Sequence, residues 1–161
     1  MENRPLLFDD YYITFQEVPN EVTLVFTVSG CPYRCRGCHS PFLQSYVGKP
    51  LKKYYERIVE TYKDYATCVC FMGGDQNSEE LTDIINDIKD KYNLKIALYS
   101  GSDKFRISLM FRCDYIKSGQ YIESLGGLNN PNTNQRFYVQ EDGRFRNKTY
   151  LFWKDHVDTT N

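Results

Sequence analysis

Three cysteines lie close together between Gly30 and His39, in a segment that reads Gly-Cys-Pro-Tyr-Arg-Cys-Arg-Gly-Cys-His. They are Cys31, Cys35 and Cys38, with the spacing Cys-x-x-x-Cys-x-x-Cys. Thiolates are the usual protein ligands of iron–sulfur clusters, and a four-iron cluster normally takes four of them. Three cysteines would leave one iron without a protein ligand, so that this iron can hold a cofactor or substrate and pass it an electron. The spacing therefore predicts a 4Fe-4S cluster with one open iron.

A structural zinc site is the alternative reading of the same cysteines. Zinc takes four converging ligands in structural sites, and His39 would have to be the fourth. Adjacent residues such as Cys38 and His39 rarely converge on one tetrahedral metal, and no second cysteine pair follows at zinc-finger spacing. The cluster is therefore the preferred interpretation.

The other three cysteines are Cys68, Cys70 and Cys113. Cys68 and Cys70 stand two residues apart in an apolar run, so that they share one face of a predicted strand. Buried cysteine packs as a small apolar side chain, and we expect that role for all three. A second cluster is the alternative for Cys68 and Cys70.

Composition excludes several classes of protein. The chain has 161 residues, a net charge of −1 and 25% charged residues, so no basic field indicates nucleic-acid binding. No apolar run approaches the length of a membrane span. The first five residues lack the apolar core of a signal peptide. We expect one cytoplasmic domain over residues 1–161, with no membrane partner.

The predicted elements bring the polar groups to one place. The apolar run 22–28 predicts a buried strand that ends at the cysteine loop, and 67–72 predicts a second one that ends in Gly73-Gly74-Asp75. Three further strands are predicted: 11–15; 95–99, which is followed by Ser100-Gly101; and 115–117, which is followed by Ser118-Gly119. Helices are predicted over 51–65 and 103–111. A third helix is predicted to begin at Asn77, with Leu81, Ile84, Ile85 and Ile88 on its buried side.

Strand, loop and helix alternate, which predicts an α/β fold with parallel strands and right-handed crossovers. A full eight-unit barrel takes about 250 residues. This chain is shorter, and we expect an open partial (β/α) barrel. Residues from about 130 to 161 do not continue the alternation of strand and helix. Their sequence predicts a loop and β-rich tail, in which 136–139 and 150–153 form a hairpin around Asp142-Gly143.

The cysteine spacing resembles the signature of the radical S-adenosylmethionine (SAM) enzymes. Because Gly37 stands before Cys38, the motif is similar to the cluster motif of the glycyl-radical activases of anaerobic (class III) ribonucleotide reductases. Gly73-Gly74-Asp75 resembles that family's SAM amino-group motif, Tyr99-Ser100-Gly101 its Tyr-Thr-Gly step, and Asn134-Gln135-Arg136 its late Asn-Gln-Arg signature. The resemblance implies a radical SAM oxidoreductase of the open-barrel type that uses a 4Fe-4S cluster and SAM.

The resemblance also implies roles for single residues. Asp75 would bind the SAM ammonium group, although a carboxylate there could instead cap the next helix. Ser100 and Gly101 would approach the SAM carboxylate or ribose, or serve only the turn. His39 would lie over the cluster or bind a loop carbonyl. Asn134, Gln135 and Arg136 would bind SAM, face a partner protein or order their loop, and these uses stay open.

The implied reaction needs no acid or base from the protein, because the cofactors carry the chemistry. The implied partners are the large subunit of the anaerobic reductase and a low-potential electron donor such as flavodoxin or ferredoxin. One alternative is a radical SAM enzyme that acts on a different glycyl-radical enzyme or on a small molecule. The alternative of another class is a non-catalytic zinc or iron–sulfur binding module.

Overall fold

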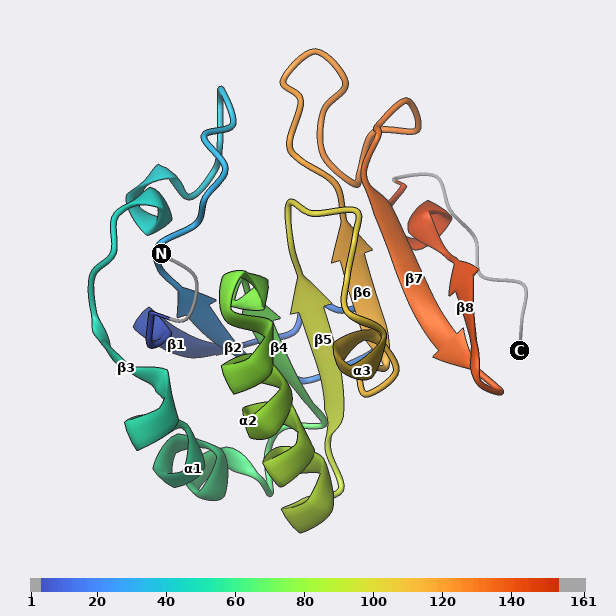
Figure 1. Ribbon diagram of the computed structural model, residues 1–161. Coiled ribbons are helices and arrows are strands. Elements are labelled where there is room, and N and C mark those ends of the chain that lie inside the picture. Colours follow the sequence, from blue (N-terminus) through green and yellow to red (C-terminus); the bar gives the residue numbers. More distant parts are fainter. Residues whose placement is uncertain (1–3, 154–161) are drawn as a thin grey trace.

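One eight-stranded sheet runs through the protein, and α1 and α2 lie on one face of it (Figure 1). The computed structural model describes residues 4–153. The strands follow the order β3-β1-β2-β4-β5-β6-β7-β8 across the sheet. Their bounds are β1 Leu7–Thr14, β2 Thr23–Val28, β3 Lys49–Pro50, β4 Cys68–Met72, β5 Lys95–Tyr99, β6 Tyr115–Ser118, β7 Arg136–Glu141 and β8 Arg144–Asn147.

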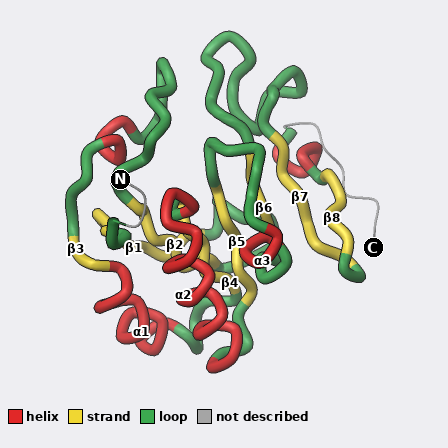
Figure 2. The backbone as a smooth tube through the Cα atoms, in the orientation of Figure 1, coloured by secondary structure: helices red, strands yellow, loops and turns green. Residues whose placement is uncertain are grey.

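The centre of the sheet is parallel, as the sequence predicts. Strand β2 pairs with β4, β4 with β5, and β5 with β6, all in parallel. Both flanks are antiparallel: β1 pairs with β2 and β3 on one side, and β7 pairs with β6 and β8 on the other. The carboxyl ends of four parallel strands therefore meet at one edge, where the long loops of Figure 2 gather.

The sheet is mixed and open, with β3 and β8 as its outer strands among the described residues. The expected open α/β architecture is confirmed. A partial barrel is not demonstrated by this strand order and stays a prediction. Residues 154–161 of the predicted tail lie outside the described part of the chain.

Two amphipathic helices cover the centre of the sheet. Helix α1 (Leu51–Tyr62) buries Leu51, Tyr55, Ile58 and Val59, and ends three residues earlier than predicted. Helix α2 (Ser78–Lys91) begins after Asn77, whose side-chain oxygen accepts a hydrogen bond from the Glu80 backbone N–H at 3.2 Å. Acidic residues in its first turn and lysines in its last suit the helix dipole. No helix within residues 4–153 combines the length and apolar character needed to cross a membrane.

The predicted helix over 103–111 is mostly wrong. Only Ile107–Met110 forms a single helical turn, α3, and Ile107 is exposed. Leu109 is the one residue of this turn that is fully buried. A longer helix in this segment would bury little further apolar surface, so tertiary packing would not stabilise it.

The predicted tail hairpin is half right. Its first strand is β7, but its second is β8 and not 150–153. Asp142 and Gly143 have φ values of 52° and 75°, as in the two-residue turns that connect hairpins directly. The second strand must therefore start at once, and Glu141 pairs with Arg144. The apolar residues that follow form a short 3-10 helix, η3 (Thr149–Phe152), in which Phe152 packs against Phe137 with 4.9 Å between ring centres.

Alternate residues of the strands build two cores. The larger lies between the sheet and α1 and α2, around Phe26 and Phe71. The smaller lies on the other face, around Tyr99 and Phe137, and is partly covered by Leu151 and Phe152 of η3.

A buried carboxylate holds the opposite end of the sheet from the long loops. Glu21 accepts hydrogen bonds from Thr67 at 2.7 Å, Lys95 at 2.8 Å and Tyr115 at 2.9 Å. Burial alone would raise the pKa of Glu21, but these three donors lower it below its ordinary value. One side chain thus joins the starts of four parallel strands.

Candidate functional site

The cysteine loop leaves the carboxyl end of β2 and returns along a short 3-10 helix, η1 (Pro41–Gln44). Two backbone hydrogen bonds close its base, from Gly30 N to Ser45 O at 3.1 Å and from Cys31 N to Leu43 O at 2.8 Å. Gly30 has a φ of 77°, which favours glycine where the chain turns away from the strand. Cys31, Cys35 and Cys38 are all free and half-buried.

The electrostatics of the loop fit a bound iron–sulfur cluster. Burial raises the pKa of the Cys31 thiol, and Cys35, Cys38 and Asp75 raise it further. Three potentially anionic groups are therefore near enough to Cys31 to disfavour its thiolate. Bound iron would offset that effect, because its positive charge stabilises the thiolate form of a coordinating cysteine.

The residue types in the loop suit an iron–sulfur cluster, for which thiolate is the usual protein ligand. Within residues 4–153, no group of three or more His, Cys, Asp or Glu side chains converges closely enough to hold one metal ion. A structural zinc ion requires such convergence of four ligands. In a 4Fe-4S cluster each thiolate binds a different iron, so the sulfurs stand around the cluster instead.

The remaining cysteines are placed in the two cores. Cys68, Cys70 and Cys113 are fully buried. Burial raises the pKa of all three thiols, that of Cys113 to about 12. Their burial fits the packing role expected from the sequence.

Asp75 lies at the carboxyl end of β4, after Gly73 and Gly74 with φ values of 90° and 108°. Its Oδ2 accepts a hydrogen bond from Ser100 Oγ at 2.9 Å, which joins the ends of β4 and β5. Burial raises the pKa of Asp75, and the bond from Ser100 opposes that rise. Asn77, not Asp75, caps α2. The half-buried carboxylate is thus not explained by helix capping.

Gln76 ties this turn to the cysteine loop, although no role for it was predicted from the sequence. Its side-chain oxygen accepts from Gly74 N at 2.9 Å, and its Nε2 donates to Ser29 O at 3.0 Å. A Cβ on Gly73 would lie 3.2 Å from Val28 O, so the end of β4 passes close to the end of β2. The position of Gln76 directly after the Gly-Gly-Asp motif was the only available signal.

Tyr33 connects the cysteine loop to the end of β5. A Cβ on Gly101 would lie 2.8 Å from the Tyr33 ring, so the ring rests directly on this glycine. Ser100 also accepts a hydrogen bond from Ser102 N at 2.9 Å, which shapes the same turn. The structure therefore brings together the cysteine loop, Asp75 and Ser100-Gly101, as the sequence predicts for the ends of parallel strands.

The loop after β6 reaches back to the cysteine loop. Arg36 forms an exposed ion pair with Glu123 at 3.4 Å, and the His39 ring packs against Tyr121 with 5.3 Å between ring centres. His39 thus has a packing partner within the loops.

Lys117 is a second residue for which no role was predicted from the sequence. It is half-buried on β6, and its Nζ lies 5.7 Å from the centre of the Tyr99 ring. Burial lowers the pKa of Lys117, against the opposing influence of Cys70, Glu17, Cys38 and Cys35. The Lys117 amino group therefore lies on the face of the sheet that carries Tyr99, where burial disfavours its charged form.

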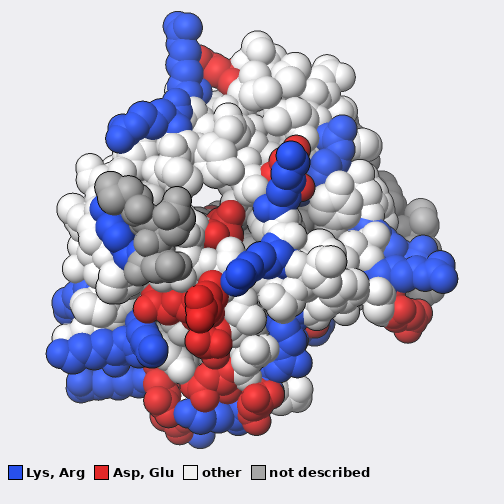
Figure 3. All heavy atoms as spheres, viewed as in Figure 1, with Lys and Arg blue, Asp and Glu red and all other residues white. Residues whose placement is uncertain are grey.

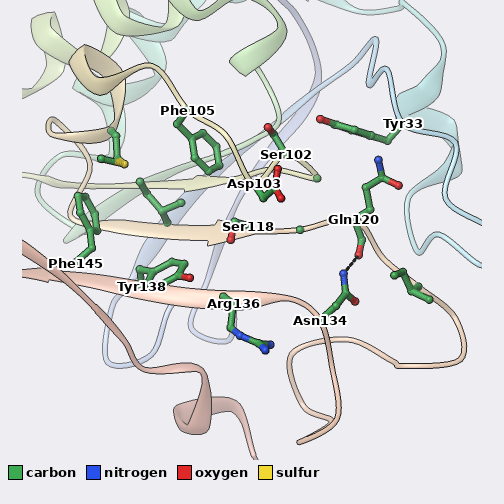
Figure 4. A pocket seen from close by; sticks show the side chains of 15 residues that line it. Tyr33, Ser102, Asp103, Phe105, Ser118, Gln120, Asn134, Arg136, Tyr138 and Phe145 are labelled. Carbon is green, nitrogen blue, oxygen red and sulfur yellow. Dashed lines mark hydrogen bonds between the residues drawn. The ribbon is translucent and has the colours of Figure 1, made fainter.

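Asn134, Gln135 and Arg136 form the entry to β7. Asn134 Nδ2 donates to Gln120 O at 3.0 Å, and Gln135 Nε2 donates to Gly119 O at 3.2 Å. Arg136 Nη1 donates to two carbonyls of its own segment. These bonds order the loop, while Asn134 and Arg136 also line a cavity beside β6 (Figure 4).

Charge is mixed over the face of the molecule shown in Figure 3. Lys and Arg side chains alternate there with Asp and Glu side chains over the helices. No broad basic field covers this face, in keeping with the net charge of −1.

Comparison with known families agrees with the donor chemistry. Residues 21–137 match the family described as 4Fe-4S single cluster domain. The matched range includes the cysteine loop, Asp75, Ser100 and Asn134. Comparisons with curated proteins and with solved structures gave no match. Since the match spans most of the chain, and the three half-buried thiols fit such a cofactor, the protein belongs to the 4Fe-4S single cluster domain family.

Proposed function

We propose that this protein is a radical SAM activase that generates a glycyl radical on the large subunit of an anaerobic ribonucleotide reductase. The observation that carries the proposal is the meeting of three half-buried thiols, a half-buried carboxylate and a glycine turn at one edge of parallel strands. Ligands in open α/β folds bind at this edge.

The protein's own residues would hold the cofactors and orient them. Cys31, Cys35 and Cys38 would ligate three irons and leave the fourth to the amino and carboxylate groups of SAM. Asp75 would accept a charge-assisted hydrogen bond from the SAM ammonium group. Ser100 already donates to Asp75 and so fixes the direction of its other oxygen.

When bound in the cysteine loop, the cluster and SAM would supply a one-electron chemistry whose products are methionine, 5′-deoxyadenosine, a glycyl radical on the partner and a cluster oxidised by one electron. The electron would come from flavodoxin, ferredoxin or a similar low-potential carrier. Tyr33 and the loop after β6 would shield this edge from water.

The test is anaerobic reduction of cluster-loaded protein with SAM and the large reductase subunit, followed by electron paramagnetic resonance. We expect methionine release and a glycyl radical signal on the subunit. A radical that appears only with another glycyl-radical enzyme or a small molecule would support the alternative enzymatic function. A colourless protein that binds zinc would support a non-catalytic module and refute the proposal.

A further inference from the structure

A cavity of about 360 Å³ lies beside the start of the cysteine loop. Three segments contribute most of its lining: the N-terminal residues 4–6, the loop residues 30–34, and residues 44–46 at the end of η1 and just after it. In Figure 1 the N-terminal segment and η1 lie on one side of the cysteine loop, and the loop after β6 lies on the other. Neither Asp75 nor Ser100 lines the cavity, so it is not part of the site described above.

The lining is cationic and contains no acidic side chain. Arg4 and Arg34 are its two charged residues, and Gln44 and Gln76 add side-chain amides. Glu80 of α2 stays outside the lining, where it accepts a hydrogen bond from the backbone of the N-terminal segment at 2.6 Å. An anion is therefore the kind of ligand that this cavity attracts.

Most of the donors in the cavity are not used by the protein itself. The Arg4 guanidinium forms no hydrogen bond or ion pair with another described residue, and its Cζ lies 4.0 Å from the centre of the Tyr46 ring. Arg34 Nη1 donates to Gln44 Oε1 at 3.4 Å, which engages one of its five N–H groups. Gln76 Nε2 donates one hydrogen to a carbonyl of the cysteine loop and keeps the second. Several N–H groups are thus available to a ligand.

Two of these donors converge at Gly30. A Cβ on this glycine would lie 3.7 Å from Arg4 Nη2 and 3.9 Å from Gln76 Nε2. A guanidinium offers a planar fork of N–H groups that matches oxyanions, and its contact with the Tyr46 ring holds this fork in place. A phosphate group brings three acceptor oxygens, whereas a carboxylate brings two. Donors from several side chains therefore favour phosphate over carboxylate.

We propose that this cavity binds the phosphate group of a small ligand, whose charge acts on the neighbouring iron–sulfur cluster. Cys31 lines the cavity, so the ligand and the cluster would lie on either side of this residue. The charge around a cluster is one of the factors that set its reduction potential. Arg4 and Arg34 would favour the reduced cluster, and bound phosphate would offset their charge and lower the potential.

This inference requires the cluster of the family but neither SAM nor a glycyl-radical partner. Its failure and the failure of the proposed function are therefore distinguishable, because each is measured without the other.

The first test measures phosphate binding to the cluster-loaded protein by calorimetry at constant ionic strength. Inorganic phosphate, glycerol phosphate and acetate are the three probes. Arg4→Gln and Arg34→Gln each remove one cation from the cavity. Arg36→Gln is the matched control, since Arg36 is an exposed arginine of the same loop that does not line the cavity. Iron content is measured for every variant, so that a folding defect is recognised.

We expect the wild type to bind inorganic phosphate saturably, and Arg4→Gln and Arg34→Gln to lose about tenfold or more in affinity. Arg36→Gln should bind phosphate as the wild type does. Equal affinity for glycerol phosphate would support an organic phosphate ester as the ligand, and its exclusion would assign the site to the free ion. Absence of saturable binding, or an equal loss in Arg36→Gln, would overturn the proposal. Tighter binding of acetate than of phosphate would overturn the choice of ligand.

The second test reads the effect on the cluster in the absence of SAM. The midpoint potential is determined by redox titration with electron paramagnetic resonance, with and without saturating phosphate. We expect phosphate to lower the potential of the wild type and of Arg36→Gln. The same concentration should leave the potential of Arg4→Gln and Arg34→Gln nearly unchanged. A wild-type potential that does not respond to bound phosphate would overturn the action on the cluster.

Discussion

Replacing Asp75 by asparagine should separate binding from stability. The amide oxygen of the new side chain can still accept the bond from Ser100, so the local turn should persist. The negative charge that would receive the SAM ammonium group is lost. A hydrogen bond to a charged group contributes about 1.5–3 kcal/mol. SAM affinity should therefore fall by roughly 10- to 150-fold, while iron content stays unchanged.

The same substitution should raise the free energy of unfolding. Burial raises the pKa of Asp75, so the ionised carboxylate is less favourable in the folded protein than in the unfolded chain. Above that raised pKa the charge costs stability, and the cost disappears as pH falls through it. The wild type should also lose SAM affinity over that range, because only the ionised form attracts the ammonium group.

The assay uses cluster-loaded protein under anaerobic conditions. SAM binding is followed by its effect on the electron paramagnetic resonance signal of the reduced cluster, and stability by urea unfolding at neutral pH. Glu79→Gln is the control, since Glu79 is an exposed acid in the first turn of α2. Unchanged SAM affinity in Asp75→Asn would refute the ammonium contact, and loss of iron would show that Asp75 supports the cluster instead.

Three further changes test the ligands, the sheet and the loop contact. Alanine at Cys31, Cys35 or Cys38 should abolish the incorporation of about four irons per chain, whereas alanine at Cys68, Cys70 or Cys113 should not. Iron analysis that finds one of the buried cysteines essential would contradict the ligand assignment. Glu21→Gln should lower the free energy of unfolding by about 1–3 kcal/mol at neutral pH. Because the folded pKa of Glu21 is lowered, this difference should shrink as pH falls through that pKa, and urea titrations that find it constant would contradict the network. Gly101→Ala places a Cβ 2.8 Å from the Tyr33 ring and should lower the free energy of unfolding by about 1–3 kcal/mol. Adding Tyr33→Ala should restore part of this loss, because it removes the ring. Additive effects of the two substitutions in the double variant would argue against the contact.

The centre of the sheet could be predicted because its signals are local. The runs that became β2, β4 and β5 are apolar and bounded by glycine turns, and each is buried as expected. Parallel strands share one carboxyl edge, so the proximity of the cysteine loop, Asp75 and Ser100 followed from the strand directions alone. The cap at Asn77 was likewise readable from its spacing to Glu80.

The features that could not be predicted depend on contacts between distant segments. Gln76 matters because Ser29 is within reach, and Tyr33 because it rests on Gly101. Neither contact has a sequence pattern of its own. The apolar segment that follows β8 was assigned to a strand because its composition suits one, but the turn at Asp142 leaves it outside the ladder. Tertiary geometry decided each of these cases.

The contact between the cysteine loop and the loop after β6 has a consequence for how the protein matures. Arg36 and His39 leave the ribosome early in translation, whereas their partners Glu123 and Tyr121 are synthesised much later. A nascent chain therefore presents its three thiols before the walls around them exist. Iron delivered at that stage would meet an unshielded segment. The surroundings of the three thiols are therefore complete only after Tyr121 and Glu123 have been synthesised and the two loops have folded together.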